Sequence, residues 1–199
     1  MTANSLSASF WTERYDAERT GWDIGHTSTP LATFVDQQED AGMRILIPGC
    51  GHAYEAFYLW EKGFRKLTLL DISPRPVARL RAQFAERYQE QPEILLQDFF
   101  DHQATYDLIL EQTFFCALPP SARPAYAQKM AELLAPGGQL VGVLFNRRFS
   151  HDGPPFGGDP EEYAAYFKPY FFFKKWAPCK HSIPPRRGSE WWMELVLKA

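Results

Sequence analysis

A glycine turn and the acidic residue that ends the following apolar segment are the parts of this chain best suited to binding chemistry. The turn Gly49-Cys50-Gly51 follows the apolar run 45–47, and Asp71 closes a second apolar run. Glycines let a backbone approach a ligand closely, and an acid roughly 20 residues further on can accept hydrogen bonds from the hydroxyl pair of a ribose. The order of strand, glycine turn, helix, strand and acid predicts a nucleotide-binding βαβ unit.

The turn alone does not define its ligand. Tyr54 stands where a full G-x-G-x-x-G motif would have its third glycine, and no Gly-Lys-Ser/Thr follows as in a P-loop. A turn with a purely structural purpose is therefore an alternative interpretation. NAD and S-adenosylmethionine both fit the combination of the turn with Asp71.

Three later segments favour S-adenosylmethionine. Asp98 and Phe99 follow an expected third strand, where the ring could support a base and the acid could meet its exocyclic amine. Polar and aromatic residues, from Glu111 to Phe115, follow a fourth strand, and open α/β folds bind ligands at that edge of the sheet. The sequence LLAPGGQL at 133–140 is typical of methyltransferases that use S-adenosylmethionine.

Strands that alternate with helices are expected to position these residues. The expected strands are residues 43–47, 66–71, 94–97, 106–111, 139–145, 170–176 and 191–197. The expected helices, besides one or two within residues 1–40, are residues 53–62, 74–88, 122–134 and 161–167. Ser73 is the expected N-cap of helix 74–88, and Pro136-Gly137-Gly138 is expected to end helix 122–134. The alternation predicts an α/β, Rossmann-like fold: a mostly parallel seven-stranded sheet with helices on both faces and an antiparallel closing strand.

Length and composition limit the possible partners. A chain of 199 residues is expected to form one domain, spanning residues 1–199. The net charge of −3 favours neither nucleic acid nor a membrane surface, and no apolar run approaches the roughly 18 residues of a membrane span. The N-terminus lacks the apolar segment of a secretion signal. The three cysteines fit a reducing compartment and match no zinc spacing, so we expect a soluble, cytoplasmic protein without a metal site.

The chain resembles the thiopurine S-methyltransferase family, and within it the thiol, thiocyanate and halide methyltransferases. The similar segments occur in the same order over nearly the whole chain. They are RTGWDIG (19–25), ILIPGCGHAYE (45–55), LDIS (70–73), QDFF (97–100), LILEQTFFCALPPSAR (108–123), LLAPGGQL (133–140), GPPF (153–156) and PPRRGSEWW (184–192). FFCALPP and GPPF are not general methyltransferase features, so they make the resemblance specific. By this resemblance, residues 1–40 would be a helical, aromatic lid and residues 41–199 a Rossmann-like methyltransferase core.

The resemblance implies S-adenosylmethionine as the cofactor, S-adenosylhomocysteine as its product, and a set of residues that hold them. Gly49 would lie under the cofactor, and Asp71 would bind its ribose. Aromatic rings would cover the sulfonium, because a cation favours electron-rich faces. The implied lid residues are Trp11, Tyr15 and Trp22. The remaining implied contacts are Asp98 and Phe99 at the adenine, and Glu111.

The expected reaction is methyl transfer to a small, soft nucleophile such as a thiol, thiocyanate or halide. A thiol with a pKa of about 8.5 is partly ionised near neutral pH and needs little help from a general base, whereas an oxygen acceptor would need one. No histidine considered can be paired with an acid from sequence alone, so no catalytic residue is assigned. These histidines are His26, His102, His151 and His181.

The acceptor pocket is expected where the N-terminal loop, the loop after the fourth strand and the GPPF segment converge. Its candidate residues are Ile24, His26, Phe115, Arg147, Pro154, Phe156 and Tyr163. Residues 184–187 form a further loop that could close over this pocket.

Alternatives to sulfur methylation stay open at this point. They are a small-molecule O- or N-methyltransferase, an S-adenosylmethionine-binding protein without turnover, and a nicotinamide oxidoreductase. A small-molecule acceptor is the only partner expected, with no nucleic acid and no membrane, and the protein is expected to be a monomer or weak dimer.

Overall fold

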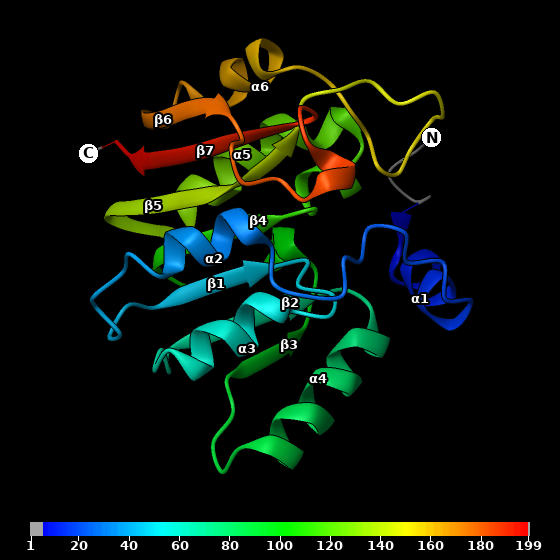
Figure 1. The fold of residues 1–199 in the computed structure, drawn as a ribbon, viewed down its shortest axis with the longest axis vertical. Coiled ribbons are helices and arrows are strands. Elements are labelled where there is room, and N and C mark those ends of the chain that lie inside the picture. Colours follow the sequence, from blue (N-terminus) through cyan, green and yellow to red (C-terminus); the bar gives the residue numbers. More distant parts are fainter. Residues whose placement is uncertain (1–5, 199) are drawn as a thin grey trace.

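The computed structural model describes residues 6–198 and is built on one seven-stranded sheet (Figure 1). The strands are β1 (Ile45–Pro48), β2 (Leu67–Asp71), β3 (Glu93–Leu96), β4 (Tyr106–Gln112), β5 (Leu134–Phe145), β6 (Phe171–Pro178) and β7 (Glu190–Leu197). Their order in the sheet is β3-β2-β1-β4-β5-β7-β6. Strands β1 to β5 pair in parallel, whereas β7 pairs antiparallel with both β5 and β6. The predicted, mostly parallel sheet with an antiparallel strand near its end is confirmed.

Helices cover both faces of this sheet. They are α1 (Ala8–Asp16), α2 (Thr29–Val35), α3 (Tyr54–Glu61), α4 (Pro74–Arg87), α5 (Arg123–Glu132) and α6 (Pro160–Phe167). Short 3-10 turns lie at Phe99–Asp101, Phe115–Ala117, Pro120–Ala122 and Pro184–Arg186. No helix among residues 6–198 is long and apolar enough to cross a membrane.

Alternation of apolar side chains along β1 explains why two cores form. Successive residues of a strand point to opposite faces. Ile45 and Ile47 pack with apolar residues of α2, α3 and α4, whereas Leu46 packs with those of α5 and α6. All four residues of β1 are buried, as expected for a central parallel strand.

Helix α1 is held at the carboxyl edge of the sheet, next to the start of α4. Figure 1 shows it set apart from the other helices, beyond the carboxyl end of β1. Thr12 Oγ1 lies 3.0 Å from Ser73 Oγ, and Asp16 pairs with Arg75 at 2.5 Å. Ser73 also caps α4 as predicted, because its hydroxyl accepts a hydrogen bond from Arg75 N–H. Helix α2, in contrast, packs into the core through Leu31, Phe34 and Val35.

The predicted end of helix 122–134 is wrong. Helix α5 ends at Glu132, and Leu134 already pairs with Tyr106 as the first residue of β5. The Pro-Gly-Gly segment therefore lies within β5, where the register with β4 shifts. Gly137 has a φ of +76°, and a Cβ on Gly138 would lie 2.9 Å from the carbonyl oxygen of Ala135. The glycines thus permit an irregularity within β5, and they do not end helix α5.

Gly142 of β5 provides a test of how tightly β4 and β5 pack. It lies opposite Glu111, and a Cβ at this position would collide with Glu111 Cβ and its carbonyl oxygen. We predict that Gly142→Ala lowers the free energy of unfolding by about 1–3 kcal/mol, the usual cost of overpacking. Urea denaturation measures this. Gly21→Ala, where nothing lies within 4 Å of the new Cβ, is the control. Equal stabilities of the two variants would contradict the packing argument.

Candidate functional site

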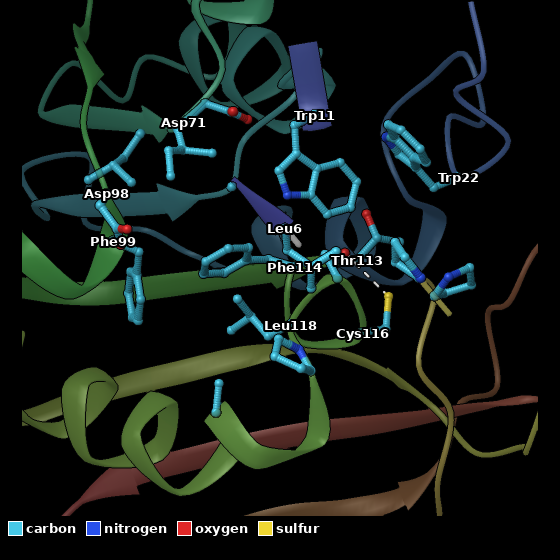
Figure 2. Close-up of a pocket in the computed structure, with 18 of the residues that line it drawn as sticks. Leu6, Trp11, Trp22, Asp71, Asp98, Phe99, Thr113, Phe114, Cys116 and Leu118 are labelled. Carbon is cyan, nitrogen blue, oxygen red and sulfur yellow. Dashed lines mark hydrogen bonds between the residues drawn. The ribbon is translucent and has the colours of Figure 1, made fainter. Parts of the chain in front are cut away.

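A cavity of about 270 Å³ lies at the carboxyl ends of β1, β2 and β4 (Figure 2). Seven of the eight residues that the resemblance assigned to the cofactor line it: Trp11, Tyr15, Trp22, Gly49, Asp71, Asp98 and Phe99. Figure 2 shows Asp71, Asp98 and Phe99 toward one side of the cavity and Trp22 and Cys116 toward the other. The fold therefore brings together residues from four separate segments of the chain.

Asp71 ties the glycine turn after β1 to the turn after β2. Its Oδ2 accepts a hydrogen bond from Gly51 N–H at 2.9 Å, and its Oδ1 accepts one from Ser73 N–H at 2.8 Å. Burial raises the pKa of this carboxyl, although the N–H donors oppose the shift. Each oxygen can accept a second hydrogen bond. The two oxygens of Asp71 are therefore placed to receive a pair of hydroxyl groups from the cavity.

Neither glycine of the turn has room for a side chain. Gly49 and Gly51 have φ values of +56° and +52°, which side-chain-bearing residues rarely adopt. A Cβ on Gly49 would collide with the ring of Phe114, and one on Gly51 would lie 3.0 Å from the hydroxyl of Tyr15. The turn thus presents bare backbone to the cavity floor.

Asp98 and Phe99 form one side of the cavity together with the turn that follows β3. Asp98 Oδ1 accepts a hydrogen bond from Phe100 N–H at 2.9 Å and caps the short helix Phe99–Asp101. Its half-buried carboxylate also lines the cavity. Phe99 is 3% exposed, and its ring centroid lies 5.2 Å from that of Phe114. We call this part of the cavity, with Asp71, the polar end.

Three aromatic side chains cover the cavity from the N-terminal segment. The rings of Trp11 and Tyr15 contact that of Trp22 edge to face, with centroids 5.5 and 5.8 Å away. Burial, followed by the charge of Asp71, raises the pKa of Tyr15, so its phenol stays neutral. Arg186 donates a hydrogen bond to the Trp22 carbonyl at 2.6 Å. The loop at 184–187 therefore holds the aromatic segment in place.

Glu111, the eighth expected residue, does not line the cavity. Its Oε1 accepts hydrogen bonds from the N–H groups of Phe114 and Phe115 at 2.8 and 2.9 Å. Its Oε2 accepts one from the Tyr126 hydroxyl at 2.5 Å. The side chain is fully buried, and burial raises its pKa to about 7 against the effect of these donors. Glu111 thus stabilises the turn that places Thr113 and Phe114 at the cavity, although its own side chain does not line the cavity.

The structure does not gather the expected acceptor residues into one pocket. Phe115 and Tyr163 are each 1% exposed and pack in the core, with ring centroids 5.0 Å apart. Arg147 is exposed and lies over Phe149, and Phe156 donates its N–H to the Cys116 carbonyl outside the cavity. Pro154 does line the cavity. Ile24 and His26 line a second, smaller cavity.

A different group of residues lines the far end of the main cavity. This apolar end consists of Cys116, Ala117, Leu118, Pro119, Ala122, Pro154 and Pro155. Cys116 Sγ donates a hydrogen bond to the Thr113 carbonyl at 3.3 Å, and burial, then the charge of Glu111, raises its pKa to about 12. The sequence analysis placed the loop that contains FFCALPP at the acceptor pocket. Which of its side chains enter the cavity depends on the turn that the hydrogen bonds of Glu111 hold in place.

A histidine–carboxylate pair, which was not found from the sequence, lies beside the glycine turn. His52 Nδ1 lies 2.5 Å from Asp23 Oδ2, and both side chains are largely buried. The two residues are 29 positions apart and belong to different loops. Their spacing therefore matches no sequence motif that would predict the pair. Among the residues that the structure describes, no three His, Cys, Asp or Glu side chains are grouped so that they could hold a metal ion.

The fold belongs to the class of Rossmann-like methyltransferases. The structure of 1,6-didemethyltoxoflavin-N1-methyltransferase from Burkholderia thailandensis, bound to S-adenosylhomocysteine, is similar with a TM-score of 0.76. The match covers 98% of this chain and 89% of that one, at 18% sequence identity. This likeness confirms the predicted fold.

The particular family follows from the sequence comparisons. The family model for thiopurine S-methyltransferase (TPMT) matches residues 6–187, and the chain belongs to this family. Probable thiol methyltransferase 2 of Arabidopsis thaliana is 32% identical over 96% of this chain and 84% of that protein. Thiocyanate methyltransferase 1 of the same plant is 30% identical over 90% of this chain and 81% of that protein. The predicted family and enzyme class, an S-adenosylmethionine-dependent methyltransferase, are confirmed.

The raised pKa of Glu111 predicts a pH-dependent stability. Because the folded-state pKa lies near 7 and the ordinary value is 4.5, the folded state binds more protons between these pH values. The wild type therefore loses stability as pH rises through this window, by up to about 3 kcal/mol. Glu111→Gln removes the titration. We predict that its free energy of unfolding, relative to wild type, increases from pH 4.5 to 7 and is constant above.

Urea denaturation at a series of pH values tests this prediction. Glu161→Gln, at an exposed position on α6, is the matched control and should follow the wild type at every pH. A constant difference between Glu111→Gln and wild type across the window would show that the carboxyl of Glu111 does not titrate there.

Proposed function

We propose that this protein transfers the methyl group of S-adenosylmethionine to a small, soft nucleophile, with an organic thiol as the preferred acceptor. The observation that carries the proposal is the contrast between the two ends of the main cavity. The polar end holds the carboxylates of Asp71 and Asp98, whereas the apolar end has, within residues 6–198, no acid, histidine, lysine or arginine. The names of the relatives, thiol and thiocyanate methyltransferase, agree with this proposal.

The residues of the polar end fit the nucleoside part of S-adenosylmethionine. Asp71 would accept hydrogen bonds from the ribose hydroxyls with the lone pairs that Gly51 and Ser73 leave free. Asp98 would accept one from the adenine amine, and Phe99 would support the ring. At Gly49 only backbone would border the cofactor, because any side chain at this position would occupy the cavity.

The aromatic side chains over the cavity would stabilise the positive charge. When bound, S-adenosylmethionine supplies a methyl group activated by a positively charged sulfur. Trp11, Tyr15 and Trp22 present electron-rich rings to this region and exclude water from it. Holding an acceptor in line with such a methyl group can lower a barrier by several kcal/mol, up to roughly 7–11 in ideal cases.

The apolar end favours an acceptor that arrives already ionised. Cys116 is its one titratable side chain in the described part of the chain, and with a pKa of about 12 it is a neutral thiol that accepts no proton at neutral pH. Leu118, Pro119 and Pro154 would contact the body of an organic thiol. A thiolate needs no base. An alcohol or phenol would need a general base to remove its proton, and the described residues of the apolar end supply none.

The remaining expectations from the sequence form part of this proposal. Cys50, Cys116 and Cys179 are free thiols, as in a reducing compartment, which supports a cytoplasmic location. We also propose a monomer or weak dimer whose one ligand besides the cofactor is a small-molecule acceptor.

The ribose contact can be tested by calorimetry. We predict that Asp71→Asn weakens S-adenosylhomocysteine binding by about tenfold or more, because hydrogen bonds to a charged acceptor contribute about 1.5–3 kcal/mol each. Asp36→Asn, on the exposed surface beside Lys62, is the control and should bind as the wild type does. Thermal melting shows whether the variants are folded. An unchanged affinity in Asp71→Asn would remove this residue from the proposed site.

The absence of a base from the apolar end predicts how the rate depends on pH. With two organic thiols of different acidity, each pH–rate profile should rise with ionisation of its own thiol, so the midpoints should differ by the difference in the two pKa values. A phenol of similar shape should react far more slowly. The measurement is formation of S-adenosylhomocysteine over a pH series. A common midpoint for both thiols would indicate a titrating group of the enzyme and contradict the proposal.

A further inference from the structure

Arg123 is a buried cation at the first position of α5. Its side chain is 1% exposed, and it does not itself line the main cavity. The positive end of a helix dipole disfavours a cation at this position, and a buried charge is costly unless it is paired. Neither helix formation nor solvation therefore accounts for an arginine here. Its contacts with other segments of the chain must stabilise it.

The guanidinium of Arg123 joins the start of α5 to α6 and to the loop before α6. Its Nη1 donates a hydrogen bond to Glu162 Oε1 of α6 at 3.1 Å. Its Nη2 donates to the backbone carbonyls of Phe156 and Gly157, at 3.3 and 2.9 Å. A planar guanidinium can make several such hydrogen bonds at once in a fixed geometry. One side chain thus fixes the end of the GPPF segment (153–156) to α5.

Two aromatic rings hold the guanidinium in this orientation. Cζ of Arg123 lies 4.9 Å from the ring centroid of Phe115 and 5.0 Å from that of Tyr163. Phe115 belongs to the turn after β4, and Tyr163 belongs to α6. A cation over an aromatic face is bound more strongly where water is excluded, and both rings are 1% exposed. These two residues were expected to line the acceptor pocket, and they contact Arg123 instead.

The segments that Arg123 joins also form the apolar end of the main cavity. Cys116 lies on the turn after β4, and Pro154 and Pro155 belong to the GPPF segment. All three line the cavity. The two segments contact each other directly, because Phe156 N–H donates a hydrogen bond to the Cys116 carbonyl at 2.7 Å. A displacement of the guanidinium would therefore move parts of the cavity wall that belong to different segments.

We propose that Arg123 is a positioning residue for the methyl acceptor. It holds the GPPF segment against the turn after β4 and so determines which acceptors the apolar end can bind. This inference rests on the proposed function, which places the acceptor at that end. The body of an organic thiol would depend on the positions of Pro154 and Pro155, whereas a small ion such as thiocyanate would make few contacts with them. Asp71 and Asp98 have other hydrogen-bond partners, so Arg123 should not affect cofactor binding.

Two acceptors of different size test the proposal. Arg123→Lys keeps a positive charge for Glu162, but an ammonium group cannot reproduce the planar set of hydrogen bonds. We expect this variant to raise KM for thiophenol by about tenfold or more, because small displacements of groups that position a reactant have effects of this size. KM for thiocyanate and the affinity for S-adenosylhomocysteine should each change by less than about twofold, as for independent sites. Formation of S-adenosylhomocysteine with each acceptor, and calorimetry, give these values.

A purely structural role of Arg123 would have a different kinetic signature. If the variant only lowered the folded fraction, kcat with both acceptors would fall together while both KM values stayed the same. Arg44→Lys is the matched control, because Arg44 donates two side-chain hydrogen bonds to Asp107 on the exposed surface before β1. It should change none of the measured values. Thermal melting gives the folded fraction of each variant.

A second variant tests the proposal even if Arg123→Lys does not fold. A Cβ on Gly157 would collide with the carbonyl oxygen of Arg147. Gly157→Ala therefore displaces the backbone to which Arg123 donates, while Arg123 itself is kept. The same selective rise in KM for thiophenol is expected.

Each outcome bears on one hypothesis. A rise in KM that is confined to thiophenol supports the positioning role. Parallel changes for both acceptors, or no change for either, would overturn it and leave Arg123 as a residue that only stabilises the fold. If the wild type methylates neither acceptor, the proposed function fails instead.

Discussion

The carboxylate of Asp71 is the interaction on which the geometry of the site depends. One oxygen holds Gly51 of the turn after β1, and the other holds Ser73 at the start of α4. The hydroxyl of Ser73 lies in turn 3.0 Å from Thr12 of α1, the helix that carries Trp11 and Tyr15. Loss of this carboxylate would therefore loosen the floor and the cover of the cavity together. The remaining lone pairs of Asp71 are fixed in direction because the first ones are in use.

Charge is distributed around the site by region. Carboxylates lie at the polar end and in the second cavity, and aromatic rings lie between them at Trp11 and Trp22. Within residues 6–198, the only titratable side chain at the apolar end is Cys116, whose thiol is neutral. Under the proposed function, the cofactor and the uncharged body of the acceptor would occupy separate regions. Under our proposals the enzyme supplies alignment and exclusion of water, and the acceptor brings its own negative charge.

Two buried polar arrangements show where sequence reasoning reaches its limit. Glu111 lies near the end of β4 and was expected to contact the cofactor, but its carboxylate accepts hydrogen bonds from Phe114, Phe115 and Tyr126 outside the cavity. His52 pairs with Asp23 across two loops, a contact that no spacing indicates. In both cases the partner was set by chain segments that meet only in the folded molecule.

The sequence by itself determined the family, the order of strands and helices, and seven of the residues that meet at the cavity. The order of elements follows from apolar periodicity and from the glycine turn with Asp71, which act locally or within a single βαβ unit. The family, and with it residues such as Trp11 and Trp22, followed from the resemblance of several motifs along the chain to a known family. Only the tertiary structure decided which side chains of FFCALPP face the cavity, that Pro136-Gly137-Gly138 lies within β5, and that Asp23, Glu55 and Gln112 share a second cavity. Those outcomes depend on packing and hydrogen bonds between distant segments. A linear pattern does not encode them.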